Sequence, residues 1–157
     1  MKIGKTGISG LMILDKISDS TFRLVMTSEL GPKLLDLEMS PDGYKVNYAY
    51  PKLKRKKVLQ SFYDDFSCVC GLQTWGEKPI AHDSLSTIEY SFPLKRKVKI
   101  SYIFDKLSMK CSSAVIQKKS RILTRFYYFR QTDTGEINKI FIEHTNFPLS
   151  IHLKKIE

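Results

Sequence analysis

The sequence has few of the residues that mark disulfide scaffolds, disordered chains or membrane spans. It contains 3 cysteines, 8 glycines and 6 prolines among 157 residues. The odd cysteine number and the absence of a CxxC pair exclude a disulfide framework and a cysteine zinc site. We expect Cys68, Cys70 and Cys111 to be thiols, with a bridge from Cys111 to one of the other two as the alternative. No apolar run approaches the roughly 18 residues of a membrane-spanning helix.

Signatures of catalysis and of metal binding are also lacking. His82, His144 and His152 share no metal-ligand spacing, and the chain has neither a nucleophile-elbow GxSxG nor a Gly-rich phosphate loop. Asp64 and Asp65 are adjacent on the expected helix, so they point about 100° apart and form no carboxylate dyad. We expect both to lie on the solvated helix surface. The sequence therefore predicts a non-enzymatic protein without metal or cofactor.

One segment, residues 51–71, has the apolar spacing of an amphipathic helix. Pro51 suits a first helical position, and Gly71 suits the residue just past the end. We therefore predict a helix over residues 51–70. Its apolar stripe consists of Leu59, Phe62, Tyr63, Phe66, Val69 and Cys70.

The rest of the chain alternates apolar and polar residues with the period of strands, and turn signals such as Pro41-Asp42-Gly43 separate the segments. The expected strands are residues 8–17, 21–28, 33–40, 44–50, 85–92, 98–104, 109–118, 121–130, 137–145 and 147–156. We predict a mainly β (α+β) single domain over residues 1–157. Its curled antiparallel sheet or incomplete β-barrel has about ten strands, with the helix packed in the concave face.

The charge is strongly of one sign, with 26 Lys and Arg against 16 Asp and Glu, for a net charge of +10. The cations gather in two runs, which are Lys54, Arg55, Lys56 and Lys57, and Lys95, Arg96 and Lys97. The first run lies at the helix start, where the helix dipole favours acidic residues instead. We predict that both runs contact an anionic membrane surface or a phosphate-bearing ligand, with a merely solvated surface as the alternative.

Aromatic residues recur on the expected inner faces of the strands and helix. They fit either an ordinary core or the wall of a cavity for an apolar ligand. The candidate cavity residues are Tyr48, Phe62, Phe66, Trp75, Tyr90, Tyr102, Phe104 and Phe126. In residues 121–130, Phe126 and Tyr128 face one way while Tyr127 and Phe129 face the other, an arrangement that could stack nucleic-acid bases. No recognised nucleic-acid motif accompanies it, so nucleic acid ranks last among the expected partners.

Three segments carry a resemblance to a known group of proteins: ISGLMILDKISDSTFRLVMTSELGPKLLDLEMS, DGYKVNYAYPKL and IFIEHTNFPLSIHLKKIE. They resemble lipoproteins from Bacteroidetes bacteria. The order of four strands, a helix and a longer strand series also resembles the LolA/LolB lipoprotein-carrier fold. The resemblance implies an incomplete antiparallel barrel around a hydrophobic cavity, with helical cover.

The resemblance further implies a non-enzymatic lipoprotein that binds or carries a lipid or a lipoprotein acyl chain. We expect a monomer on the periplasmic side of the outer membrane, held by a lipid anchor whose cysteine lies outside this chain. Without a signal segment upstream, we expect a cytoplasmic protein instead. The alternative function is a structural or adaptor lipoprotein whose barrel is filled by its own side chains and which binds other envelope proteins.

Overall fold

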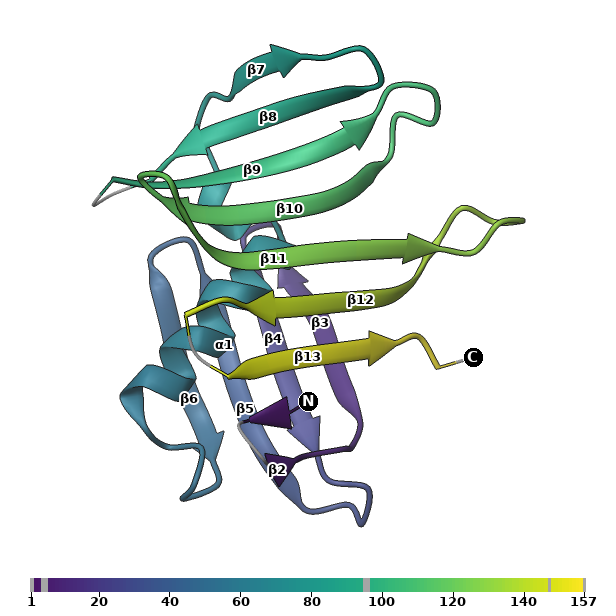
Figure 1. The fold of residues 1–157 in the computed structure, drawn as a ribbon. Helices are drawn as coiled ribbons and strands as arrows, with labels where there is room; N and C mark the ends of the chain where they lie inside the picture. Colours follow the sequence, from purple (N-terminus) through teal and green to yellow (C-terminus); the bar gives the residue numbers. More distant parts are fainter. Residues whose placement is uncertain (1, 4–5, 95–96, 147, 157) are drawn as a thin grey trace. The chain divides into compact units, whose positions relative to one another are not determined.

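The computed structural model describes residues 2–3, 6–94, 97–146 and 148–156. The chain divides into two compact units, one made of Met1–Gly7 with Lys78–Glu157 and the other of Ile8–Glu77. The prediction of a mainly β chain with one α-helix is confirmed for the described residues (Figure 1). The organisation as one domain stays a prediction.

Four antiparallel strands form the sheet of the 8–77 unit. They are β3 (Met12–Ser18), β4 (Thr21–Thr27), β5 (Lys33–Ser40) and β6 (Gly43–Ala49), in that spatial order. The expected turn joins β5 to β6, where Ser40 pairs with Gly43. The first strand begins four residues later than predicted. The apolar run 8–11 misled the prediction because only Met12 onward pairs with β4 in the ladder.

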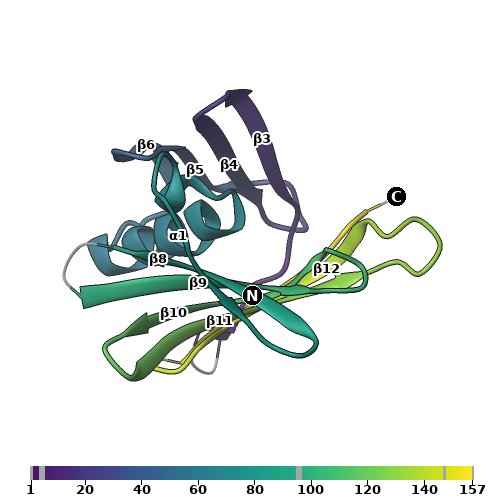
Figure 2. The same cartoon turned by 90° about the horizontal axis from the view of Figure 1, so that it is seen from above.

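One face of this sheet is apolar and carries the helix α1 (Lys56–Val69). Leu24, Leu35, Leu37 and Met39, from the two central strands, are all 0% exposed. The helix packs against β5, and Figure 2 shows it beside the strands of its own unit. At the end of β5 the Tyr63 hydroxyl donates a hydrogen bond to the Ser40 carbonyl, with an O···O distance of 2.9 Å.

The helix is shorter than predicted at its start. Its N-cap is Arg55, because the chain from Tyr50 first makes a turn in which the N–H of Leu53 donates to the Tyr50 carbonyl. Its end agrees with the sequence signal, since Cys70 is the C-cap and Gly71 follows in the left-handed conformation at φ 72°. The first turn contains no acidic residue.

The helix buries more than its predicted stripe. Leu59, Phe62 and Phe66 are buried as expected, but Asp65 is 0% exposed. The expectation that Asp65 lies on the solvated surface is therefore wrong. The apolar periodicity identified one buried side of α1. A second buried side carries Ser61 and Asp65, and a pattern of apolar residues does not reveal it because these two residues are polar.

The opposite face of the four-stranded sheet holds a buried carboxylate. Asp36 is 1% exposed and accepts hydrogen bonds from Arg23 at 2.9 and 2.8 Å and from Lys33 at 2.8 Å. The Arg23 and Lys33 cations, together with Asn47, hold the pKa of Asp36 well below its usual range. The Arg23 and Lys33 cations thus compensate for the hydration that the Asp36 carboxylate loses on burial.

The second unit is a nine-stranded antiparallel sheet. Its spatial order is β2-β1-β13-β12-β11-β10-β9-β8-β7. The strands are β1 (Lys2–Ile3), β2 (Thr6–Gly7), β7 (Ile80–Asp83), β8 (Thr87–Pro93), β9 (Val98–Asp105), β10 (Cys111–Lys118), β11 (Arg121–Arg130), β12 (Ile137–His144) and β13 (Leu149–Lys154). Apart from the short β1, β2 and β7, each was predicted to within a few residues, although Phe147 lies outside the described residues.

The described strands form two antiparallel sheets, and neither of them closes into a barrel. Along the sequence, α1 lies between the two strand series, and among the described residues no ladder joins β6 to β7 or β8. The strand β7 was missed because Ile80 and Ala81 are too short an apolar signal to stand out from a loop.

Cross-strand register assigns the residues of the nine-stranded sheet to two faces. Ala114, Phe126, Ile142 and Ile151 form one row across β10 to β13, and each is at most 1% exposed. The neighbouring positions, which include Tyr127 and Phe141, lie on the other face. The predicted alternation along residues 121–130 is confirmed by this register.

Candidate anion-binding surface

The predicted cavity residues divide between the two units. Tyr90 lies opposite Tyr102, and its ring contacts Phe104 edge-on at 5.6 Å, on the face of the nine-stranded sheet that also carries Phe126. These four residues come together as the alternation predicted. Their grouping is equally that of a packed core, because Phe126 is 0% exposed.

In the 8–77 unit the predicted cavity residues do not all meet. Phe62 and Phe66 are each 1% exposed, and their rings stack at 6.3 Å. Trp75 is 55% exposed, after the short 3-10 turn that follows α1. Tyr48 is 42% exposed, and a register shift beside it pairs it with Asp36, on the face opposite Leu37 and Val46. Strict alternation along β6 predicts that Tyr48 and Val46 share a face. The register shift that separates them leaves no signal in the sequence.

The first basic run lies at the start of α1. Lys54, Arg55, Lys56 and Lys57 are all exposed, and the Arg55 side chain makes no capping hydrogen bond. These side chains are therefore solvated cations, which agrees both with the predicted anion contact and with the alternative of a merely solvated surface. Nothing else among the described residues at this helix end points to a ligand.

The second basic run lies at the turn between β8 and β9. Lys97 is exposed and has a left-handed backbone with φ 60°, whereas Lys95 and Arg96 lie outside the described residues. The turn contains no acidic residue in residues 93–97. What the sequence did not show is which segment lies next to it.

That neighbour is the turn between β10 and β11, with the sequence Lys118-Lys119-Ser120-Arg121. The backbone N–H of Lys119 donates a hydrogen bond to the Lys97 carbonyl at 3.2 Å, so the two turns lie side by side at one end of the sheet (Figure 1). We call Lys97, Lys118, Lys119 and Arg121 the cationic end. Sequence reasoning missed the last three as site residues because Lys118 and Arg121 are predicted as ends of two strands and the turn between them was not considered. The signal was the basic run Lys118-Lys119-Ser120-Arg121 itself.

Within the described part of the chain, the cationic end is not paired with acidic side chains. Lys118, Lys119 and Arg121 are exposed, and none of the four residues forms an ion pair with another described residue. The nearby Lys99 differs, because its ammonium contacts the Glu89 carboxylate at 3.3 Å. Hydrogen bonds from Ser101, Ser91 and Lys99 lower the pKa of Glu89, which therefore stays ionised and paired within the sheet.

The described part of the chain offers little for catalysis or metal binding. No group of three His, Cys, Asp or Glu side chains there could hold a metal ion. Burial raises the pKa of Cys70 to about 12 and also raises that of Cys111, which keeps both thiols protonated, and none of the three cysteines forms a disulfide. In the same residues, no helix combines the length and the apolarity needed to cross a membrane.

Comparisons with protein-family models, with curated proteins and with solved structures find no significant match to this chain. The resemblance to lipoprotein carriers, the acyl ligand, the envelope location and the monomeric state therefore all stay predictions. The arguments for a function rest on the residues themselves.

Proposed function

We propose that this protein is a non-enzymatic binding protein that contacts a phosphate-bearing polyanion through the cationic end of its nine-stranded sheet. The observation that carries the proposal is the hydrogen bond between Lys119 and Lys97, which sets two turns of like charge beside each other. Folding brings these cations together although residues 97 and 118 are far apart in the chain.

Charge of one sign in one place costs free energy unless a counter-charge is bound. A net charge of +10 could be spread over the whole surface. The net charge by itself therefore does not explain why these cations are grouped at one end of the sheet. Exposed lysines bind phosphate as mobile point charges, and Arg121 adds a fork of donors that fits two phosphate oxygens. The chemistry of the cationic end thus suits phosphate groups on a polymer or on a membrane surface.

The test compares the wild-type protein with two variants of equal net charge. The first carries Lys118→Gln, Lys119→Gln and Arg121→Gln; the matched control carries Lys54→Gln, Lys56→Gln and Lys57→Gln in the exposed run before and within the start of α1. Binding to inorganic polyphosphate is measured by calorimetry at about 0.1 M salt, and circular dichroism checks that each variant is folded. Co-sedimentation with vesicles of phosphatidylglycerol and phosphatidylcholine tests the membrane as the source of phosphate.

We expect the first variant to lose at least about tenfold in affinity for polyphosphate, because three contacts of roughly 0.5 kcal/mol or more each are removed. The α1 variant should bind within about threefold of the wild type. Equal losses in both variants would mean that net charge alone attracts the anion, and the proposal would then be wrong.

A further inference from the structure

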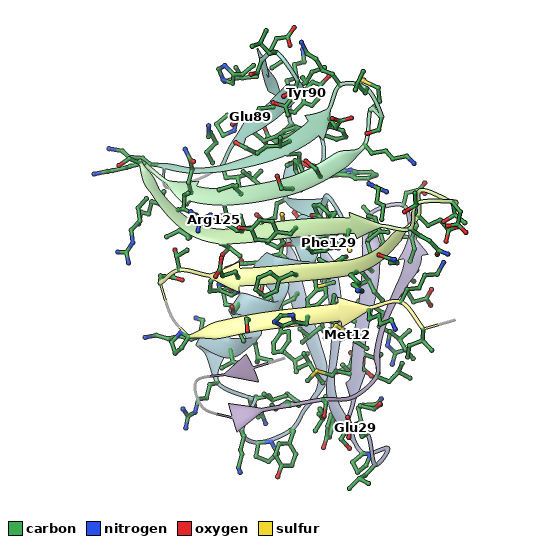
Figure 3. The ribbon with its side chains drawn as sticks, turned by 45° about the vertical axis from the view of Figure 1, so that its right-hand side comes forward. Met12, Glu29, Glu89, Tyr90, Arg125 and Phe129 are labelled. Atoms are coloured by element: carbon green, nitrogen blue, oxygen red, sulfur yellow. The ribbon has the colours of Figure 1, made fainter. Side chains whose placement is uncertain are left out.

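The exposed face of three neighbouring strands, β11, β12 and β13, combines aromatic rings with cations. Register places Tyr127, Phe141 and His152 in one row across the strands, and Phe129, Lys139 and Lys154 in the row beside it. We call these six residues the ring–cation block. Figure 3 shows the side chains of these strands, with Phe129 labelled on β11.

In the first row, formed by Tyr127, Phe141 and His152, neighbouring rings contact one another, and we call this row the ring column. The rings of Tyr127 and Phe141 stack with centroids 5.9 Å apart, and the Phe141 and His152 rings follow at 4.3 Å. Directly opposite Tyr127 on β10 is Ser113, whose side chain is too small to cover a ring. The ring column therefore meets only a small side chain at its β10 end, and His152 is exposed at the other.

The second row contains one exposed ring and two lysine side chains. Phe129 is 50% exposed, so a large part of its ring is accessible to a ligand. Lys139 and Lys154 are also exposed and lie directly opposite each other on neighbouring strands. Like charges at opposed positions destabilise a sheet, and an anion between the two ammonium groups would remove that repulsion.

We infer that the ring–cation block binds single-stranded nucleic acid. Its bases would stack on Phe129 and at the ends of the ring column, and its phosphates would lie against Lys139 and Lys154. Single-stranded nucleic acid presents planar bases and phosphate groups along one chain. Proteins that bind it without sequence preference combine aromatic rings, on which the bases stack, with cations that contact the phosphates. A paired duplex hides its base faces and would not make these contacts.

The inference rests on the proposed function, because it names the polymer that supplies the phosphates to the cationic end. Arg121 begins β11, and Phe129 lies eight positions further along the same strand. At about 3.3 Å per residue the two are separated by roughly 26 Å, a span that an extended chain of a few nucleotides covers. The positions between them include Arg125, half-buried on the same face as Tyr127 and paired with Glu143 at 3.9 Å.

The decisive variant is Phe129→Leu, which removes the ring and keeps an apolar side chain. Its matched control is Tyr48→Leu, since Tyr48 is an aromatic residue 42% exposed on the other sheet. Fluorescence anisotropy measures binding of a labelled 12-nucleotide oligo-U and of a duplex of the same length. Inorganic polyphosphate of equal charge, the probe used above, is titrated in parallel.

We expect the wild type to bind oligo-U more tightly than either polyphosphate or the duplex. Phe129→Leu should weaken oligo-U binding about tenfold and leave polyphosphate binding unchanged, because only bases stack on a ring. Tyr48→Leu should change neither. A second variant, Lys139→Gln with Lys154→Gln, should weaken the binding of oligo-U and lower its salt dependence.

The outcomes separate the two proposals. Binding of polyphosphate without a preference for oligo-U, or an unchanged oligo-U affinity in Phe129→Leu, overturns the nucleic-acid inference and leaves the proposed function standing. Binding of neither polyanion overturns both. Tight binding to anionic vesicles combined with no preference for oligo-U would assign the cationic end to a membrane surface instead.

Discussion

The backbone N–H of Lys119 donates to the carbonyl of Lys97 across two turns that are distant in sequence. Both lysines have a left-handed backbone, with φ 55° and 60°. That conformation costs an ordinary residue about 1–2 kcal/mol, and glycine or asparagine is the usual choice for it. The protein thus places two lysines where its stability would favour other residues, which is the pattern expected when the charge is needed for binding.

Lys119→Asn should separate stability from binding. Asparagine tolerates the left-handed backbone better than lysine, so we expect the melting temperature to stay equal or to rise by a few degrees. The same change removes one cation, so affinity for polyphosphate should fall by about twofold to fivefold. Differential scanning calorimetry and titration calorimetry measure the two quantities, and a stability loss with unchanged binding would contradict this account of Lys119.

Asp36→Asn should destabilise the 8–77 unit. The substitution keeps the shape of the side chain but replaces charge-assisted hydrogen bonds from Arg23 and Lys33 by neutral ones, at a cost of about 2 kcal/mol. The matched control is Glu38→Gln on the same strand, which lies directly opposite Arg23 and should cost less than about 0.5 kcal/mol. Urea unfolding gives both values, and equal effects would mean that the Asp36 cluster has no special role.

The same carboxylate should make stability depend on acid. The pKa of Asp36 is lower in the folded chain than in the unfolded chain, so its contribution is fully present above the unfolded value near 4. It is lost progressively as the pH falls below 4 toward the folded pKa. Urea midpoints between pH 6 and pH 2 should therefore fall more for the wild type than for Asp36→Asn, and parallel curves would be inconsistent with this assignment.

Cys70 should resist alkylation in the folded protein. Burial raises its pKa to about 12, so at pH 8 almost none of it is thiolate, the reactive form. We expect iodoacetamide to modify Cys70 at least about 100-fold more slowly in the native protein than in urea. Mass spectrometry of a digest follows each cysteine separately. Rapid labelling of Cys70 under native conditions would show that its surroundings open readily.

Local pattern predicted the elements well because strand alternation and turn residues are local properties. β5 and β11 were predicted to the residue, and Gly71 marked the helix end correctly. The division into two sheets was missed, because which strands pair depends on contacts between distant segments. Register shifts are equally hidden, and the one beside Asn47 moved Tyr48 to the polar face.

For the candidate site, too, the sequence predicted what depends on neighbouring residues but not the contacts between distant segments. Lys97 was identified from a basic run in the sequence, but its neighbour Lys119 comes from a turn more than twenty positions away. The alternation that put Tyr127 and Phe129 on one face was visible in advance. Their meeting with Phe141 and Lys139 required the pairing of β11 with β12, which the sequence pattern leaves open.

The salt dependence of polyphosphate binding tests the central claim most directly. The logarithm of the dissociation constant is plotted against the logarithm of salt concentration for the wild type and for the triple variant at Lys118, Lys119 and Arg121. Each cation that contacts a phosphate contributes about 0.7 to the slope for a flexible single-stranded polyanion, so the variant should show a slope smaller by about 2. An unchanged slope would mean that these residues do not touch the anion, and the cationic end would not be its binding site.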